Sequence, residues 1–355
     1  MTALSTARTL RNAADLVDAG LASPDRLPDL ERVAARYAVA ISPLMAELVD
    51  NVHLHDPIAR QFVPDAAELD STDAERTDPI GDKAHEVVPG LIHRYPDRVL
   101  LKLANICAVY CRFCFRREMV GPGRRTHLSD AEIDAALAYI AAHADVWEVI
   151  VSGGDPLVLS PRRLASLSAK LGAIPHVKVL RWHSRVPLVA PERVDDELIA
   201  ALKSEGVTTW LAIHANHPSE FTDAGRSALG RIADAGIPMV SQTVLLKGVN
   251  DDARTLAGLM RAFVQNRVKP YYLHQGDLAP GTSHLRTGIA DGRSLMKDIR
   301  GTVSGLCQPT YVLDLPGGYG KVPIGPCYIG ETSSASWSVE DPQGARHAYP
   351  PSVNR

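Results

Sequence analysis

The sequence predicts an α/β protein in which helices cover a parallel sheet. Apolar, strand-like runs recur along the chain, amphipathic helical patterns separate them, and polar residues stand where the runs end. The runs are 98-RVLLKLA, 146-VWEVIVSG, 177-VKVLRWHS, 208-TTWLAIH, 237-IPMVSQTVL and 268-VKPYYLH. They are too apolar for a sheet with one face in water, so we expect both faces to be covered.

Helical patterns fill the intervals between these runs. The clearest are 129-SDAEIDAALAYIAAH, 195-DDELIAALKSEG and 252-DARTLAGLMRAFVQN. Six β-α units are two fewer than a closed eight-stranded barrel needs, so we predict a partial (β/α)6 barrel. The polar residues at the ends of the runs are Ser152, His183, His214, Gln242 and His274. Active groups are expected at this carboxyl edge of a barrel.

Three regions are expected along the chain. Residues 1–97 form an N-terminal extension, with helical spacing to about residue 45 and then a wrapping segment rich in Asp, Pro and His. Residues 98–305 form the barrel. Residues 306–355 contain a glycine-rich lysine motif and a polar tail, which we expect at the surface or partly disordered.

Composition favours small-molecule chemistry. The 355 residues carry a net charge of -3, which gives no electrostatic reason to expect nucleic acid or an anionic membrane as partner. No stretch approaches the ~18 uninterrupted apolar residues of a membrane span, and the first residues lack the apolar core of a signal peptide. We therefore expect a cytoplasmic protein, in which cysteines more often serve metals or catalysis than disulfides.

The stretch 105-NICAVYCRFCFRRE-118 contains three of the five cysteines, spaced C-x3-C-x2-C. These are Cys107, Cys111 and Cys114, directly after the first strand. Structural zinc and plain electron-transfer iron-sulfur clusters usually take four protein ligands. Three ligands leave one metal position open, where a substrate could bind. A zinc site completed by a distant residue and buried thiols without metal remain alternatives.

With the aromatic Phe113 before its last cysteine, this motif resembles that of the radical S-adenosylmethionine enzymes. The resemblance implies a 4Fe-4S cluster on the three cysteines, with S-adenosylmethionine at the fourth iron. It also implies reductive cleavage to a 5'-deoxyadenosyl radical, which takes a hydrogen from the substrate. The electron would come from a donor such as flavodoxin or ferredoxin. A partial barrel is the fold of this superfamily.

A second motif, 311-YVLDLPGGYGKVP-323, follows the last predicted strand of the barrel. It is not a Walker phosphate loop, because the spacing fails and Val322 follows the lysine. By itself it is typical of a surface turn with a solvated lysine. A lysine beside small residues can also approach a cofactor aldehyde closely, and lysine forms a Schiff base with pyridoxal phosphate.

Together the two motifs resemble those of the lysine 2,3-aminomutase family. The resemblance runs from about residue 40 to 330 and also includes 90-GLIHRYPDRVLL, 152-SGGDPL, 183-HSRVPLVAPERV, 214-HANHPSE, 241-SQTVLLKGVND and 271-YYLHQGDLAPGTSHLRT. It implies an isomerase that interconverts L-lysine and β-lysine by radical migration of the amino group. Pyridoxal phosphate would hold the migrating nitrogen, and S-adenosylmethionine would act as a reusable cofactor.

The resemblance also assigns cofactor residues. Lys321 would hold pyridoxal phosphate as a Schiff base. Its phosphate would be bound by Arg94, Tyr95 and Arg98, a role suited to the geometry of arginine. S-adenosylmethionine would be bound by Ser152, Gly153, Gly154, Asp155, His214 and Gln242. Without the resemblance, these arginines would be interpreted as surface charges, and His214 and Gln242 would be interpreted as core or rim polar groups with satisfied hydrogen bonds.

Three residues are assigned to the substrate. Arg116 would bind the α-carboxylate. Without the resemblance it would be interpreted as a solvated loop arginine. Asp277 and Asp314 match the pair that binds the ε-ammonium of lysine. Asp314 stands between apolar residues, where an unpaired carboxylate is costly, so a cationic partner is physically reasonable. Asp277 could equally be a turn residue. Two acids favour lysine over glutamate, but arginine and ornithine stay open.

Two departures from the family bear on assembly and pathway. Asp252 stands where the longer clostridial-type enzymes carry a zinc-ligand cysteine, so we do not expect their zinc-linked subunit assembly here. We expect a homo-oligomer, such as a dimer. The segments 114-CFRR and 183-HSR resemble a shorter relative that makes β-lysine for elongation factor P, which lacks the D-x-P-G-G-x-G-K form found here. Free β-lysine metabolism and supply to translation both stay open. A structural metal-binding protein is the non-enzymatic alternative.

Overall fold

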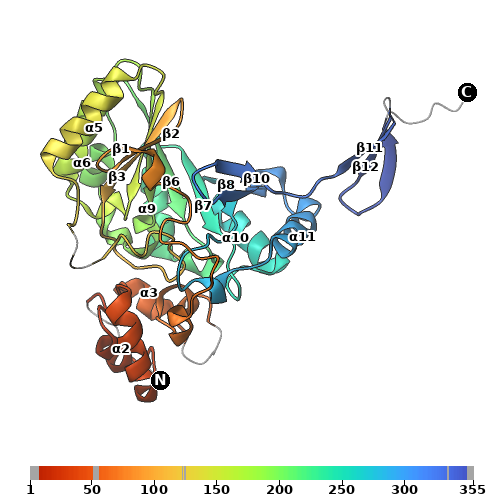
Figure 1. The fold of residues 1–355 in the computed structure, drawn as a ribbon, viewed down its shortest axis with the longest axis horizontal. Coiled ribbons are helices and arrows are strands. Elements are labelled where there is room, and N and C mark those ends of the chain that lie inside the picture. The colour runs from red at the N-terminus through yellow and green to blue at the C-terminus, as the bar shows by residue number, and fades with distance from the viewer. Residues whose placement is uncertain (1–7, 51–55, 122, 124, 334–335, 350–355) are drawn as a thin grey trace, which may run out of the picture.

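The computed structural model describes residues 8–50, 56–121, 123, 125–333 and 336–349. Its centre is a ten-stranded sheet, in which β1 to β10 lie side by side in chain order (Figure 1). Seven neighbouring strands are parallel: β3 (Arg98–Ala104), β4 (Glu148–Gly153), β5 (Val179–Ser184), β6 (Thr208–His214), β7 (Met239–Val244), β8 (Val268–His274) and β9 (Thr310–Leu315). The six predicted strands are thus confirmed. β9 is a further parallel strand, in a segment that we placed beyond the barrel.

Antiparallel strands extend the sheet at both edges. β1 (Glu86–Val88) and β2 (Leu91–Tyr95) pair beside β3, and β10 (Gly320–Pro323) pairs with β9. The first two lie in the segment expected to wrap around the barrel without strands. They are short, and Gly90 with a φ of 80° makes the tight turn between them. No described strand pairing joins β1 to β10, so hydrogen bonds do not close this sheet into a barrel.

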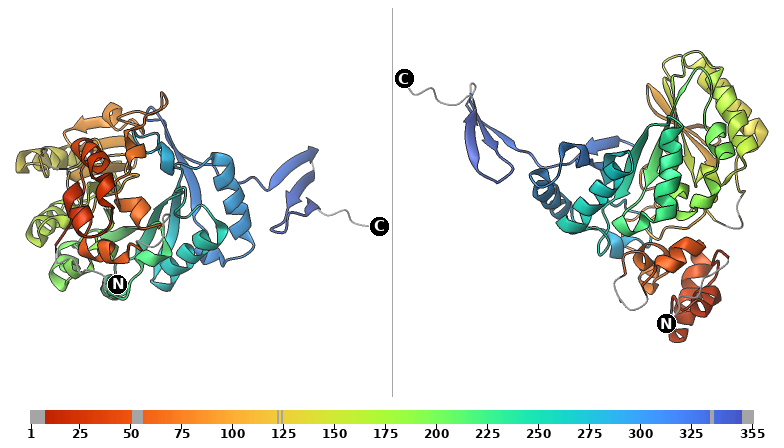
Figure 2. Two further views of the ribbon diagram at one scale, coloured as in Figure 1. Left: turned by 90° about the horizontal axis from the view of Figure 1, so that it is seen from below. Right: turned by 180° about the vertical axis from the view of Figure 1, so that it is seen from behind.

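Helices cover the outside of the curved sheet (Figure 2). They are α5 (Asp130–Ala142), α6 (Pro161–Gly172), α7 (Val186–Val189), α8 (Asp196–Ala201), α9 (Asp223–Asp234), α10 (Ala253–Gln265) and α11 (Ile289–Arg300). Side-chain caps fix where several begin; Ser129 accepts from the backbone N–H of Glu132, and Asp252 from that of Thr255 at 2.9 Å. Trp182 of β5 is fully buried beneath them.

The N-terminal region is helical, as its spacing predicts. It contains α1 (Ala13–Asp18), α2 (Leu27–Arg36), α3 (Pro43–Leu48) and α4 (Ala59–Phe62). These helices pack under the cysteine loop, where the backbone N–H of Tyr110 donates to Ala40 and that of Arg112 to Gln61. Short 3-10 turns occupy Pro24–Arg26, Ala66–Leu69, Lys83–His85, Pro156–Val158, Pro191–Arg193, Pro218–Glu220, Ser283–Leu285 and Gly305–Cys307.

The C-terminal tail forms an antiparallel sheet of β11 (Ile329–Ser333), β12 (Ser336–Glu340) and β13 (Arg346–Tyr349). This arm projects from the body of the molecule (Figures 1 and 2). From its polar, proline-containing sequence we expected this tail at the surface or partly disordered, and its three short strands were not predicted. Of the helices in the described ranges, none is long and apolar enough to span a membrane.

Candidate active site

A cavity of about 670 Å³ opens among the inner faces and carboxyl ends of the parallel strands and the cysteine loop. Every residue that the sequence assigns to a cofactor or to the substrate lines it. These are Arg94, Tyr95, Arg98, Cys107, Cys111, Cys114, Arg116, Ser152, Gly153, Gly154, Asp155, His214, Gln242, Asp277, Asp314 and Lys321. The structure thus brings together residues that lie more than 200 positions apart in the chain.

The three cysteines follow β3 in a loop and not on a helix. Burial raises the pKa of all three thiols. Burial and the neighbouring Cys111 together raise the pKa of Cys114 to about 11, and the Asp155 carboxylate and the neighbouring thiols add to the effect of burial on Cys107. Thiolates in such surroundings need a cationic partner, which the irons of a cluster supply. The site therefore fits an iron-sulfur cluster bound by three cysteines.

The zinc alternative finds no support in the described residues. No three His, Cys, Asp or Glu side chains within them lie close enough together to hold one metal ion. A 4Fe-4S cluster makes no such demand, because each thiolate binds a different iron. The remaining cysteines, buried Cys307 and exposed Cys327, do not line the cavity.

The turn after β4 lies against the start of the cysteine loop. Gly153 has a φ of 108°, and a side chain on it would collide with the carbonyl oxygen of Ala104. A side chain on Gly154 would collide with the backbone carbonyl oxygen of Ile106. Only glycine permits this close approach. The turn therefore packs directly against the backbone of the cysteine loop, which fixes the distance between the end of β4 and the cysteines.

Asp155 fixes this turn rather than offering a free carboxylate. It accepts hydrogen bonds from the hydroxyl of Ser184 at 2.8 Å and from the backbone N–H groups of Arg185 at 2.7 Å and Leu157 at 3.0 Å. Burial raises its pKa, and these hydrogen bonds act in the opposite direction. Its contribution to a ligand site is therefore the shape of the turn.

Histidines provide unoccupied hydrogen-bonding positions in the cavity. The Nε2 atoms of His183 and His214 are buried without a partner, and burial lowers the pKa of both rings well below the usual range. The ring of His214 meets Phe113 edge-on, with centroids 5.7 Å apart. Buried polar atoms are normally satisfied, so the neutral rings fit a site in which a bound ligand is the missing partner.

Lys321 faces Asp314 across the β9–β10 ladder. Its amino group forms an ion pair with the Asp314 carboxylate and lies 3.3 Å from Nδ1 of His274. Its backbone N–H donates to the hydroxyl of Tyr95 at 2.7 Å, and Gly320 packs against the same tyrosine. The lysine is thus held with its amine in the cavity, a position that fits attachment of an aldehyde cofactor.

The two acids assigned to the substrate differ in state. Burial alone would raise the pKa of Asp314, but its hydrogen bond with His274 and the charge of Lys321 outweigh burial and lower it. For Asp277, burial and the charge of Asp314 raise the pKa to about 7. No described side chain pairs with Asp277. One acid is therefore ionised and paired, and the other is available.

Two of the assigned arginines share one carboxylate that the sequence did not indicate. Arg94 and Arg116 each contact Asp82 at 3.1 Å, and the Nε atoms of both are buried without a partner. Arg98 lies over the ring of Tyr95, with its guanidinium carbon 3.9 Å from the centroid. Guanidinium donors thus remain for anionic groups of ligands.

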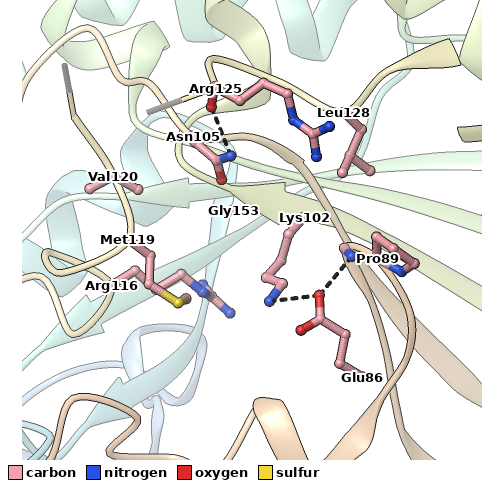
Figure 3. A pocket seen from close by; sticks show the side chains of 11 residues that line it. Glu86, Pro89, Lys102, Asn105, Arg116, Met119, Val120, Arg125, Leu128 and Gly153 are labelled. Atoms are coloured by element: carbon pink, nitrogen blue, oxygen red, sulfur yellow. Dashed lines mark hydrogen bonds and ion pairs between the residues drawn. The ribbon is translucent and has the colours of Figure 1, made fainter. Parts of the chain in front are cut away.

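A smaller pocket of about 310 Å³ adjoins the large cavity and shares Arg116 and Gly153 with it. In Figure 3 the amino group of Lys102 points to Glu86, 3.4 Å away, and Arg116 approaches from the other side. Arg125 pairs with Glu132 at 2.6 Å. The small pocket is lined by none of the three cysteines and by neither Asp277, Asp314 nor Lys321, which leaves the large cavity as the better candidate.

Sequence reasoning missed His274, Asp82 and Arg185. His274 joins Gln242 to the Lys321–Asp314 pair, and its place at a strand end was its only signal. Arg185 lies in the quoted 183-HSR segment, but no role was assigned to it. Asp82 precedes the sheet in an irregular segment, and no pattern marks it.

Comparisons with known proteins identify the family of the chain. A model of the radical SAM superfamily matches residues 101–259, and a lysine-2,3-aminomutase model matches residues 296–351. L-lysine 2,3-aminomutase of Acetoanaerobium sticklandii is 41% identical over 307 residues, which cover 86% of this chain and 74% of the relative. The enzyme of that name from Clostridium subterminale is 40% identical over 316 residues, or 89% and 76% of the two chains.

A relative with another printed substrate also matches. Glutamate 2,3-aminomutase of Clostridioides difficile is 35% identical over 300 residues, which cover 84% of this chain and 70% of the relative. The shared chemistry is the isomerisation of an amino acid by a radical SAM enzyme, which implies a 4Fe-4S cluster and S-adenosylmethionine. The chain belongs to the lysine 2,3-aminomutase family and is a radical SAM aminomutase that acts on a small-molecule substrate.

Proposed function

We propose that this protein interconverts L-lysine and β-lysine. The observation that carries the proposal is the placement of Arg116, Asp277 and Asp314 around one cavity. A lysine has a carboxylate at one end and an ammonium group at the other. The cavity offers a guanidinium for the first and two carboxylates for the second.

In this proposal Cys107, Cys111 and Cys114 hold the 4Fe-4S cluster, and Lys321 holds pyridoxal phosphate. When bound, these groups and S-adenosylmethionine supply a hydrogen-abstracting radical and a carbonyl carbon for the migrating nitrogen. The turn at Gly153 and Gly154 forms part of the cavity wall proposed for S-adenosylmethionine, and the unpartnered Nε2 of His214 would be available to bind it. The backbone hydrogen bond to Tyr95 holds Lys321 in place.

The remaining cofactor contacts are assigned from the charge of the cavity side chains and from their positions. Arg94 and Arg98 bind the phosphate of pyridoxal phosphate beside Tyr95. Gln242 is hydrogen-bonded to His274 and contacts S-adenosylmethionine through its remaining donors. His274 stays neutral, because burial and the charge of Lys321 lower its pKa. Its Nδ1 atom lies 3.3 Å from the Lys321 amine and can accept a hydrogen bond from it.

The acids favour a cationic side chain. With its pKa near 7, Asp277 carries a proton in part of the molecules at neutral pH, and an arriving ammonium group favours its release. A glutamate side chain would instead place a third carboxylate beside Asp277 and Asp314. The glutamate-named relative shows that side-chain charge can differ within the family, and this pair of acids supports lysine here.

Arginine and ornithine are the alternative substrates, because both also end in a cation. Supply of β-lysine for elongation factor P is an alternative role with the same chemistry. The proposal also includes an external one-electron donor, such as a flavodoxin or ferredoxin, and assembly of the chain into a homo-oligomer, such as a dimer.

The test is an anaerobic assay of the full chain. It is reconstituted with iron and sulfide, supplied with pyridoxal phosphate, S-adenosylmethionine and a strong reductant, and given L-lysine, L-arginine, L-ornithine or L-glutamate separately. β-Lysine, identified by mass-resolved chromatography, is the expected product. Conversion of ornithine or arginine in place of lysine would overturn the substrate assignment and keep the aminomutase chemistry.

A further inference from the structure

Arg185 is a buried cation that contacts a cysteine of the cluster motif. It follows β5 directly and is 5% exposed. Its Nη1 donates to the sulfur of Cys111 at 3.1 Å. Its Nη2 donates to Glu220 and to the side-chain oxygen of Gln61, each at 2.6 Å. One guanidinium therefore joins the cysteine loop to α4 and to the loop after β6.

The surroundings hold this guanidinium in one orientation. Its carbon lies 4.7 Å from the ring centroid of Phe62 and 5.6 Å from that of Phe113. Glu220 is fully buried and also accepts the backbone N–H groups of Asn216 and His217, at 2.8 and 2.9 Å. Arg185 cannot turn to solvent without leaving this carboxylate unpaired in the interior.

The arrangement directs positive charge at the sulfur. The Nη2 end of Arg185 is neutralised by Glu220, and the Nη1 end points to Cys111. Among the described residues, no other Arg or Lys side chain donates a hydrogen bond to a cysteine of the motif. Hydrogen bonds to ligand sulfurs and the charge around a cluster set its reduction potential. A cation here stabilises the extra negative charge that the cluster carries after reduction.

We propose that Arg185 is a positioning residue for the cluster, which holds Cys111 in place and raises the reduction potential by its hydrogen bond to the ligand sulfur. The inference rests on the proposed cluster at the three cysteines. The step concerned is a one-electron reduction, in which the electron comes from the external low-potential donor and no covalent bond of the protein forms or breaks.

The first test uses the unaltered full chain, reconstituted with iron and sulfide and labelled with ¹⁵N-arginine. Pulsed EPR of the reduced cluster is expected to show hyperfine coupling to an arginine nitrogen. Arg185→Lys should remove that coupling. A reduced cluster without arginine coupling in the unaltered protein would overturn the proposal and leave the cluster assignment intact. A chain that assembles no cluster would overturn both.

The second test measures the midpoint potential of the cluster by EPR-monitored redox titration. In Arg185→Met combined with Glu220→Gln, the buried cation and its carboxylate are removed together, which avoids an unpaired charge. The expected change is a fall of tenfold or more in the equilibrium constant of reduction, or 59 mV for one electron. Arg185→Lys, which keeps the charge, should restore part of the loss.

A matched pair provides the control for this titration. Arg181 and Glu148 form a bidentate ion pair at 3.0 Å on the wall of the same cavity and contact none of the three cysteines. Arg181→Gln combined with Glu148→Gln should leave the potential unchanged. Equal potentials in the unaltered protein and in the Arg185 double variant would overturn the proposal. Equal shifts in the Arg185 and Arg181 double variants would also do so, because they would show a non-local effect of charge.

Discussion

Asp314 lies beside Lys321 and the neutral His274. This carboxylate has two possible cationic partners, the Lys321 amine and the ammonium group of a bound lysine. In the structure, Asp314 pairs with the Lys321 amine. A Lys321 amine that holds pyridoxal phosphate, as proposed, would no longer pair with Asp314, and this carboxylate would be available to the ammonium group of an arriving lysine. Asp277 needs no such exchange, because no described side chain pairs with it. The pair thus suits a site that alternates between an internal and an external amine.

Removing either acid should weaken use of lysine. We expect Asp277→Asn and Asp314→Asn each to lower kcat/KM for L-lysine by roughly 10- to 100-fold, because a hydrogen bond to a charged group contributes about 1.5–3 kcal/mol. Asp291→Asn is the control, since Asp291 caps α11 at the surface. Steady-state kinetics checks this, and variants with unchanged kcat/KM would exclude these acids from the substrate site.

The pKa of Asp277 predicts how substrate use depends on pH. Its ionised form binds an ammonium group, so kcat/KM for lysine should rise with pH through about 7, where this carboxyl titrates. Asp277→Asn should remove the inflection, because the amide has no charge to gain. To check this, kcat/KM for lysine is measured in the unaltered protein and in Asp277→Asn from about pH 5.5 to about pH 8.5, which brackets the expected pKa. An inflection that persists in the variant would assign it to another group.

Attachment of the cofactor should depend on one lysine. After incubation with pyridoxal phosphate and reduction with borohydride, mass spectrometry is expected to find the modification on the peptide that contains Lys321. Lys321→Ala should remove it, and Lys102→Ala, in the smaller pocket, should not. Modification that remains in Lys321→Ala would refute this residue as the attachment point.

The residues of the site differ in how far sequence could identify them. The cysteines and Lys321 lie in two compact motifs. Because both motifs resemble those of a known family, these residues could be identified from the sequence. His274 and Asp82 act through contacts that only the fold creates: the first reaches Asp314, 40 positions away, and the second joins two arginines of different elements. Spacing along a chain contains no information about such contacts.

At the scale of elements, short turns and ladders place the reactive groups. Register in the β9–β10 hairpin puts Lys321 opposite Asp314, and a shift of one residue would turn the lysine to the other face. The glycines after β4 set the distance to the cysteine loop in the same way. The central strands could be predicted because they are apolar throughout. β1, β2 and β10 could not, because they are short and contain polar residues that line one of the two pockets.

The close approach at Gly153 predicts a loss of stability. In Gly153→Ala the added methyl group collides with the backbone of Ala104, so we expect the free energy of unfolding to fall by about 1–3 kcal/mol through overpacking, beyond the cost of its positive φ. Gly236→Ala is the matched control, because its φ of 78° is also positive and no atom lies within 4 Å of the added carbon. Urea unfolding measures both, and equal losses would refute a specific steric role.

At the scale of the whole molecule, the two ends of the chain relate differently to the site. The N-terminal region supplies Gln61 and Glu68, which bind arginines of the site and of the cysteine loop. The C-terminal arm contributes no residue to the large cavity. Its strands β11 to β13 pair only with one another, and Lys297 of α11 contacts Glu340 at 2.6 Å. The N-terminal region is therefore needed for the site, whereas the C-terminal arm is available for other contacts.

The arm predicts how the chain assembles. Ile329, Trp337 and Tyr349 are 51%, 41% and 64% exposed, and a sheet of this size needs an apolar face covered to be stable. The proposed homo-oligomer supplies that cover if the arm packs on a second copy of the chain. Light scattering should then give the mass of a dimer for the full chain and of a monomer for a chain that ends at residue 326.

Both forms should bind pyridoxal phosphate at Lys321, because the truncation removes nothing that lines the cavity. Trp337→Asp should weaken the dimer in the full chain. Tyr319→Asp should not, although Tyr319 is 84% exposed, because it lies on the β9–β10 hairpin and outside the arm. A full chain that is monomeric, or a truncated chain that keeps the dimer mass, would show that the arm does not join two copies. Retained cofactor binding in the truncated chain would still separate assembly from the chemistry of the site.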